Sequence, residues 1–253
     1  MQEQVIGILG GMGPEATLNC FDKIIRNTPA LNDQDHLKVI IVNNPKIPDR
    51  TRAVLDSGPS PLPMLIDGCA SLQKAGADFI IIPCVTVHYF IEPLKDASRL
   101  PVISILDAVA EAIGRHDPRL GTIGLLGTDG TVQSGIFQKR LARAGLDTIT
   151  CEEAVQQAAM AAIYDIKRDR PSRNRQEITR ELTTAARHLI DRGAQGIIAG
   201  CTEIPLVLTQ SEVAVPYFDS LSILARAAIR RAGREPVTVS SARSMVSTGN
   251  KSE

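Results

Sequence analysis

Two cysteines end two apolar stretches of very similar design. Residues 76–84 and 193–201 each run from a glycine through an apolar run to a cysteine, Cys84 in the first stretch and Cys201 in the second. An unbroken apolar run is typical of a parallel strand covered on both faces. Ligands of open α/β sheets bind at the carboxyl ends of such strands. Both thiols are therefore candidates for chemistry on a bound small molecule.

Two thiols on opposite walls of a cleft suit the inversion of a stereocentre. One thiolate removes a proton from one face of a carbon, and the other thiol delivers a proton to the opposite face. The ordinary thiol pKa of ~8.5 is lowered by a helix N-terminus or a nearby cation. Either cysteine alone is equally consistent with packing, because cysteine is among the most buried residue types. The matched pair favours catalysis.

An internal repeat supports this pairing. Six pairs of residues are 117 positions apart: Gly7 and Gly124, Gly10 and Gly127, Gly13 and Gly130, Arg50 and Lys167, Gly76 and Gly193, Cys84 and Cys201. One offset shared by glycine loops and cysteine strands indicates a duplicated α/β unit. Two such halves would face each other across a cleft. Each half would present a glycine loop, a thiol and a cation that can hold a carboxylate.

The elements that must position these residues alternate between strands and helices. Strands are expected at 5–9, 37–44, 76–82, 101–105, 122–126, 146–151, 193–200 and 213–218. Helices are expected at 14–26, 63–74, 154–167, 177–192 and 221–231. Two more helices would follow Cys84 and the strand at 101–105, ending near residues 100 and 115. Residues 46–51, which include Arg50, are expected to form a loop. This pattern predicts an α/β fold with two pseudosymmetric, Rossmann-like three-layer domains, parallel-sheet cores and an active-site cleft between them.

The expected domain division is discontinuous. Residues 1–100 together with 210–233 form the first domain, residues 101–209 form the second, and residues 234–253 form a flexible tail. From residue 233 the chain turns polar, which disfavours a packed core there.

Composition excludes several classes of function. There are 28 basic and 28 acidic side chains and no Trp, which disfavours a nucleic-acid partner. No apolar run approaches the ~20 residues that span a bilayer, so no membrane partner is expected. The five cysteines form no CxxC or Cys/His cluster, so neither a disulfide framework nor a metal site is indicated. The N-terminal residues lack a basic signal-type region, and we expect a cytoplasmic protein with free thiols.

Five motifs together resemble the aspartate/glutamate racemase superfamily, with the aspartate racemase branch as the nearest match. The motifs are Ile8-Leu9-Gly10-Gly11-Met12-Gly13-Pro14, Pro48-Asp49-Arg50-Thr51, Pro83-Cys84-x-Thr86-x-His88, Gly127-Thr128-x-Gly130-Thr131 and Gly200-Cys201-Thr202-Glu203-Ile204-Pro205-Leu206. The resemblance covers the chain to about residue 233. It implies a homodimer that acts on an amino acid or a related carboxylate without pyridoxal phosphate, metal or nucleotide.

The resemblance also implies the roles of individual residues. Cys84 and Cys201 would form the catalytic acid/base pair, and Arg50 and Lys167 would hold substrate carboxylates. The remaining substrate-binding positions would be Met12, Val85, Thr86, Thr128, Thr202 and Glu203. From its place in the sequence alone, Glu203 could cap a helix turn or orient the substrate, and capping is favoured.

Val85 and His88 follow Cys84 closely in the sequence. The family motif has Asn where this chain has Val85, and Val cannot donate the amide hydrogen bonds that help to bind an amino-acid head group. Losing such a contact costs about 1–3 kcal/mol. His88 follows Cys84 by four residues and would share a helix face with it. It is a candidate to support the thiolate or the substrate, or a structural hydrogen-bonding residue.

The favoured function is a cofactor-independent racemase of aspartate, glutamate or a related carboxylate. One alternative is an isomerase or decarboxylase of the same superfamily. A second is an amino-acid-binding homologue with weak turnover, suggested by Val85. A third is a nucleotide-binding Rossmann protein, suggested by the glycine loops, although Gly10-Gly11-Met12-Gly13 does not match the GxGxxG spacing.

Overall fold

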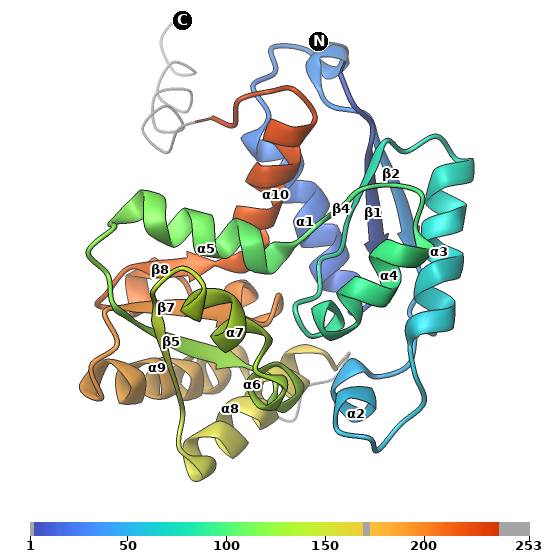
Figure 1. Cartoon of the computed structure of the whole chain (residues 1–253). Helices are drawn as coiled ribbons and strands as arrows, with labels where there is room; N and C mark the ends of the chain where they lie inside the picture. The colour runs from blue at the N-terminus through green and yellow to red at the C-terminus, as the bar shows by residue number, and fades with distance from the viewer. Residues whose placement is uncertain (1–2, 169–172, 238–253) are drawn as a thin grey trace, which may run out of the picture.

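Two four-stranded parallel sheets form the framework of the molecule (Figure 1). The computed structural model describes residues 3–168 and 173–237. The first sheet has the order β2-β1-β3-β4, from β1 (Ile6–Gly10), β2 (Val39–Asn43), β3 (Phe79–Ile81) and β4 (Val102–Ile103). The second has the order β6-β5-β7-β8, from β5 (Thr122–Gly127), β6 (Asp147–Thr150), β7 (Gly196–Gly200) and β8 (Tyr217–Asp219). The matching strand orders confirm the predicted pair of pseudosymmetric parallel-sheet units.

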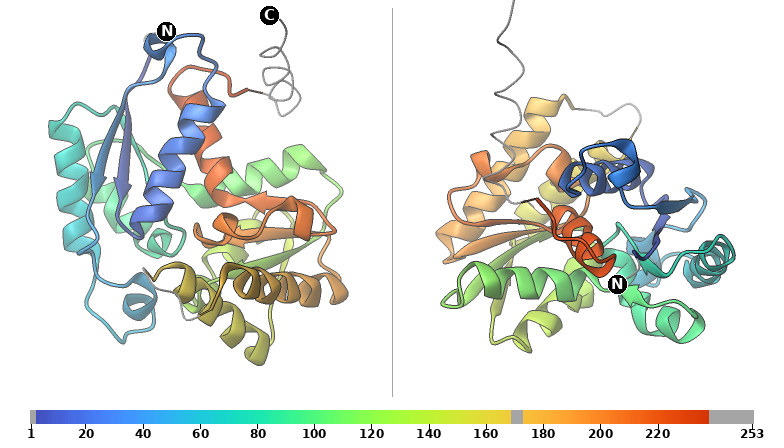
Figure 2. Two further views of the ribbon diagram at one scale, coloured as in Figure 1. Left: turned by 180° about the vertical axis from the view of Figure 1, so that it is seen from behind. Right: turned by 90° about the horizontal axis from the view of Figure 1, so that it is seen from above.

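Helices cover both faces of both sheets (Figures 1 and 2). The outer face of the first sheet packs against α3 (Leu62–Lys74) and α4 (Ile91–Ala97), and that of the second against α8 (Glu153–Ile166) and α9 (Arg175–Asp191). A central core between the sheets is filled mainly from α1 (Pro14–Asn27), α5 (Ile105–His116), α7 (Ile136–Ala142) and α10 (Ser220–Arg231). The central core takes residues from both halves, so the halves are not independent of each other.

Alternation along the strands explains the continuous apolar runs. In β3 the side chain of Ile81 enters the central core, whereas Ile80 enters the outer core under α3 and α4. In β7, Ile198 faces the central core and Ile197 faces the outer core under α8 and α9. Both faces of each strand are dry, so both side-chain registers must be apolar. Each fully buried Ile contributes roughly 1.5–3 kcal/mol of hydrophobic stabilisation.

Strands β4 and β8 do not follow the predicted domain division. Strand β4, within residues 101–209, pairs with β3 of the first sheet, and β8, within residues 210–233, pairs with β7 of the second. Each half ends with a strand and a helix, β4 then α5 and β8 then α10, so the strand stays with its own sheet. Helix α10 nevertheless packs on α1 of the first half. The boundaries themselves stay a prediction, and most of the predicted tail lies outside the described residues.

Short helices replace several predicted loops and helix starts. Arg50 is the first residue of α2 (Arg50–Val54) rather than part of a loop, because Asp49 accepts a hydrogen bond from the Arg52 amide and caps the helix. Helix α2 lies beside α6 (Asp129–Ser134) of the second half (Figure 1). After the cysteines the chain forms 3₁₀ helices, η2 (Thr86–Phe90) and η3 (Ile204–Leu206); η1 (Asp33–Asp35) and η4 (Gln210–Glu212) lie elsewhere.

Among the described residues, no helix combines the length and the apolar character that crossing a membrane requires.

Candidate functional site

A small cavity of about 20 Å³ lies where the carboxyl ends of the two sheets meet. Its walls come from both halves of the chain: Asp49, Arg50, Thr51, Cys84, Val85, Thr86, Thr128, Tyr164, Lys167, Cys201, Thr202 and Glu203. A cavity of this size holds about one water molecule. The residues that line it are mostly polar or ionisable, which is typical of a reaction site and not of a packing defect.

The two candidate thiols stand on different walls of this cavity. Cys84 follows β3 through Pro83, and Cys201 follows β7 directly. Their exposed fractions are 6% and 5%, so the two side chains are equally buried. The structure thus brings together the two cysteines that the 117-residue repeat had paired.

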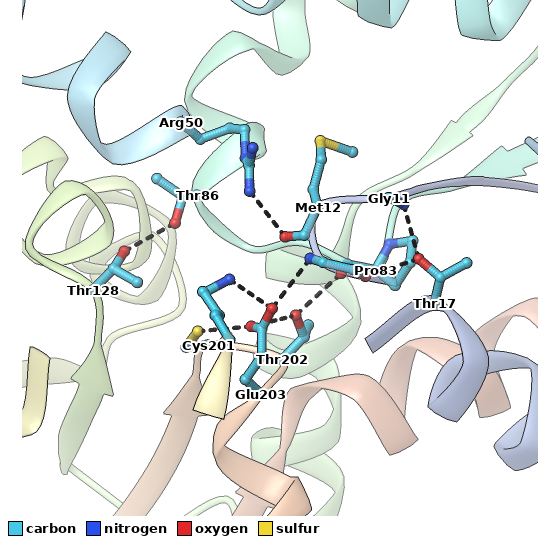
Figure 3. A network of polar contacts seen from close by, with 12 residues as sticks. Gly11, Met12, Thr17, Arg50, Pro83, Thr86, Thr128, Cys201, Thr202 and Glu203 are labelled. Carbon is cyan, nitrogen blue, oxygen red and sulfur yellow. Dashed lines mark hydrogen bonds and ion pairs between the residues drawn. The ribbon is translucent and has the colours of Figure 1, made fainter. Parts of the chain in front are cut away.

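The backbone holds the guanidinium of Arg50 in place (Figure 3). Its Nη1 donates to the carbonyls of Ile47 and Pro48 at 3.2 and 2.9 Å, and its Nη2 donates to the carbonyl of Met12 at 3.0 Å. Arg50 Nε is buried and has no partner among the described residues. A guanidinium has five N–H donors. The Nε–H and the second Nη2–H therefore remain for a ligand, and adjacent N–H groups of this kind suit bidentate binding of a carboxylate.

Glu203 is the centre of a polar network that crosses between the halves (Figure 3). Its Oε1 accepts from the Gly13 amide at 3.1 Å and from Lys167 Nζ at 2.5 Å. Its Oε2 accepts from Cys201 Sγ at 3.0 Å and lies 3.2 Å from Thr202 Oγ1. The helix-capping alternative is wrong, because the Glu203 side chain makes no cap hydrogen bond with η3.

This network keeps the Glu203 carboxylate, which is buried, and the Lys167 ammonium, which is partly exposed, charged. Burial by itself raises the pKa of the Glu203 carboxyl, but the charge of Lys167 and hydrogen bonds from Cys201, Lys167 and Gly13 bring that pKa below its ordinary value. Burial by itself lowers the pKa of the Lys167 ammonium, but the charge of Glu203, and that of Cys201 or Cys84 whenever either thiol is ionised, raises it above its ordinary value.

A second cross-link between the halves consists of threonine hydroxyls. Thr86 Oγ1 lies 2.9 Å from Thr128 Oγ1 and 2.9 Å from Thr131 Oγ1, and the last two lie 3.1 Å apart. Thr128 also caps α6 by accepting from the Thr131 amide. On the other side of the cavity, Thr202 Oγ1 donates to the carbonyl of Pro83 at 3.0 Å. These bonds hold the loop after each cysteine against the opposite half.

His88 supports the main chain at Cys84. Its Nδ1 lies 2.9 Å from the Cys84 carbonyl, and its Nε2 accepts from the Ile105 amide at 3.1 Å. That pairing makes Nδ1 the protonated nitrogen, which donates to the carbonyl. Burial lowers the pKa of His88 to about 4. His88 lines a separate pocket near α4, α5 and α7 and is not part of the cavity wall.

Met12 and Val85 were both predicted to bind substrate, but only the Val85 side chain reaches the cavity. Met12 is 1% exposed and packs in the outer core of the first half, so only its carbonyl acts in the site, through Arg50. Val85 lines the cavity and also packs in the central core.

Three cavity residues were not expected from the sequence: Asp49, Thr51 and Tyr164. Tyr164 is in the last turn of α8, three residues before Lys167, which is the C-cap of that helix. This spacing could have indicated that the two side chains lie on the same side of the helix. Asp49 and Thr51 flank Arg50 and are part of the same motif.

Within residues 3–168 and 173–237, no group of three or more His, Cys, Asp or Glu side chains is arranged to hold a metal ion.

Comparisons of sequence identify relatives over most of the chain. The family model for Asp/Glu/Hydantoin racemase matches residues 9–228. The Broad specificity amino-acid racemase RacX of Bacillus subtilis (strain 168) is 32% identical over 229 residues, which cover 89% of this chain and 96% of that racemase.

Comparisons of structure agree with this family. The aspartate racemase of Picrophilus torridus has a TM-score of 0.81 at 26% identity and covers 92% of this chain and 96% of its own. A glutamate racemase from Francisella tularensis subsp. tularensis SCHU S4, solved in complex with D-glutamate, has a TM-score of 0.65. At 14% identity, over 91% of this chain and 81% of that one, this likeness shows the fold alone.

Proposed function

This chain belongs to the Asp/Glu/hydantoin racemase family, and from that premise we propose that it inverts the α-carbon of an amino acid by two-cysteine acid/base catalysis. Cys84 and Cys201 would be the acid and the base, and no cofactor would be required. The observation that carries the proposal is the position of the two thiols, equally buried, on the walls of one cavity built from both halves. That placement is what proton removal from one face and proton delivery to the other need.

The cations of the site support a carboxylate-bearing substrate. Arg50 keeps two adjacent N–H donors free among the described residues, and they would bind the α-carboxylate. Lys167 belongs to the polar network around Glu203, and it would stabilise the negative charge that develops at the α-carbon. We propose aspartate, glutamate or a related carboxylate as substrate, in keeping with relatives named aspartate racemase and glutamate racemase.

The experiment is α-proton exchange in deuterated water, followed by NMR over a panel of L- and D-amino acids with no added cofactor. We expect racemisation with deuterium incorporated at the α-carbon. Cys84→Ala and Cys201→Ala should each reduce it by roughly 10²- to 10⁴-fold, the usual contribution of a general acid or base. Cys69→Ala is the matched control, because Cys69 is a buried thiol in the outer core, away from the cavity. Full activity in either Cys84→Ala or Cys201→Ala contradicts the proposal.

A second candidate, an amino-acid-binding homologue, is favoured by Val85. An apolar side chain lines the cavity where the family motif has an amide. Binding of an amino acid by calorimetry without any deuterium incorporation would select this candidate. Turnover to a product other than the enantiomer would instead select the isomerase or decarboxylase alternative.

We also propose that the enzyme is a cytoplasmic homodimer. All five cysteines are free thiols, which fits a reducing compartment. Leu18 and Leu31 are large apolar side chains left 67% and 90% exposed, and an oligomer interface that covered either one would remove that side chain from water. Sedimentation velocity would reveal the assembly, and a monomer at micromolar concentration contradicts the dimer.

A further inference from the structure

The two halves of the site differ in the two residues that follow each cysteine. Cys84 is followed by Val85 and Thr86, whereas Cys201 is followed by Thr202 and Glu203. The Thr86 hydroxyl is engaged with the hydroxyls of Thr128 and Thr131. Its counterpart by the 117-residue repeat, Glu203, places a carboxylate oxygen 3.0 Å from Cys201 Sγ. The two thiols therefore meet different chemical surroundings.

The Glu203 carboxylate is fixed before any substrate binds. Three donors converge on it, from Gly13, Lys167 and Cys201, and its side chain is almost completely buried. An ionised carboxylate can only accept hydrogen bonds. In the 3.0 Å contact, Cys201 must therefore be the donor, and it can donate only while it carries its proton.

Cys84 has no such partner among the residues that the structure describes. Its hydrogen bonds are made by its main chain: its amide donates to the Ile82 carbonyl, and its carbonyl accepts from His88. Lys167 lines the same cavity as Cys84, and its own ion pair is with Glu203. Within the described residues, Cys201 Sγ therefore donates to a carboxylate and Cys84 Sγ does not.

We propose that Glu203 is a positioning residue that holds Cys201 as the protonated thiol, so that the resting enzyme has Cys84 as its base and Cys201 as its acid. This inference rests on the proposed function. In the first half-reaction, the Cys84 thiolate takes the α-proton from one face of the substrate. The electron pair left on the α-carbon then takes the proton of Cys201 from the opposite face. The enzyme is left with a Cys84 thiol and a Cys201 thiolate, and no proton is gained or lost overall.

The reset of the enzyme follows from the same charges. After turnover, the Cys201 thiolate lies against the Glu203 carboxylate, and these like charges favour the return of a proton to Cys201. Burial and the charge of Glu203 raise the pKa of the Cys201 thiol well above its ordinary value, and Lys167 opposes them only in part. The enantiomer whose α-proton faces Cys84 therefore binds the resting form, and the other enantiomer binds the less stable form.

Alkylation by iodoacetamide tests the assignment, because only the thiolate reacts rapidly. The rate at each cysteine is measured by peptide mass spectrometry between pH 6 and pH 9 on the whole protein. We expect Cys84 to react at least about tenfold faster than Cys201 at neutral pH, since each pKa unit changes the thiolate fraction tenfold. The two residues have nearly equal exposed fractions, 6% and 5%. Equal rates overturn the assignment, and this comparison needs no variant.

Glu203→Gln removes the charge and keeps the size of the side chain. We expect the Cys201 rate to rise at least about tenfold while the Cys84 rate changes less than about twofold. Glu203→Asp, which restores the carboxylate, should return the Cys201 rate toward that of the wild type. Glu111→Gln, on the exposed face of α5, makes the same charge change at the surface and should alter neither rate. An unchanged Cys201 rate in Glu203→Gln overturns the assignment.

The failure of this inference is separable from the failure of the proposed function. If deuterium exchange requires both cysteines but their alkylation rates are equal, the racemase proposal stands and the role of Glu203 falls. If the alkylation rates differ as expected but no amino acid exchanges its α-proton, the racemase proposal falls, and the enzymatic direction inferred from Glu203 falls with it.

Discussion

Arg50 shows how a single side chain is prepared for a ligand by its own backbone. Three main-chain carbonyls hold the guanidinium, so little rotamer entropy remains to be lost when a carboxylate binds. A lysine at this position could not reproduce that arrangement, because its ammonium lacks the planar fork. The specificity of the site for a carboxylate therefore depends on the geometry of Arg50 as much as on its charge.

His88 makes folding stability depend on pH. Burial lowers its pKa from 6.5 to about 4, so the native state favours the neutral ring and the unfolded state binds the proton more readily. The stabilisation is complete above about pH 6.5 and is lost as the pH falls toward about 4. Over that window we expect the free energy of unfolding to fall by about 3 kcal/mol from this residue.

Chemical denaturation at a series of pH values measures this effect. His88→Gln should be less stable than the wild type at pH 7 and should lack the His88 contribution to the slope between pH 6.5 and 4. His116→Gln is the control, because His116 is exposed at the end of α5. If the slope in His88→Gln matches that of the wild type, buried neutral His88 is not its cause.

At the scale of elements, the contact between α2 and α6 sets the position of Arg50 relative to the second half. Gly130, in the first turn of α6, lies so close to α2 that an added Cβ would meet Thr51 Cα at 2.8 Å and Thr86 Cγ2 at 2.9 Å. Thr51 is the second residue of α2, directly after Arg50. Only glycine therefore allows the two helices to approach this closely.

Gly130→Ala should accordingly destabilise the protein by about 1–3 kcal/mol through overpacking, although alanine is the better helix former. It should also reduce racemisation, because α2 moves and carries Arg50 with it. Gly114→Ala in α5 is the matched control, since its Cβ would meet nothing within 4 Å. That variant should gain up to about 1 kcal/mol. Thermal unfolding of both variants measures the difference, and equal shifts in the same direction contradict the packing argument.

At the scale of the whole molecule, the two halves close over the site. The cavity of about 20 Å³ has room for about one water molecule. The bonds across it are few and specific: Glu203 to the Gly13 amide, Thr202 to the Pro83 carbonyl, and the threonine hydroxyls around Thr86. We therefore expect entry of a substrate to require these bonds to open while each sheet stays intact.

Amide hydrogen exchange by NMR can detect this opening. The Gly13 amide donates across the halves to Glu203, whereas the Gly11 amide donates to Thr17 within the first half at 2.9 Å. We expect Gly13 to exchange at least about tenfold faster than Gly11, because opening the cavity breaks the Gly13–Glu203 bond and leaves the Gly11–Thr17 bond intact. Equally slow exchange at the two glycines would show that the halves do not separate short of global unfolding.

Periodicity and repetition in the sequence were enough to predict much of the framework. The 117-residue offset relates β1 to β5 and β3 to β7, and the structure gives the two sheets the same strand order. It also pairs Cys84 with Cys201, because parallel strands at equivalent places in two sheets end at equivalent edges. Both cations that the offset pairs, Arg50 and Lys167, line the same cavity.

Contacts that cross between the halves could not be predicted in this way. The sequence placed Glu203 near Cys201 but could not show that its carboxylate also meets Gly13, which is 190 positions away in the chain. It marked His88 as a possible support for the thiol, whereas the ring reaches only the main chain of Cys84 and α5.

The sequence by itself determined which residues stand at the end of each central strand, since strand periodicity and loop glycines are local properties. The tertiary structure decided which of them meet. Tyr164 enters the cavity from α8, and Met12 turns into the core, because of how helices pack on each sheet and how one half lies on the other. The two thiols were paired by a repeat in the chain, but their unequal surroundings arise from Glu203, whose carboxylate reaches both Cys201 and the Gly13 amide of the other half.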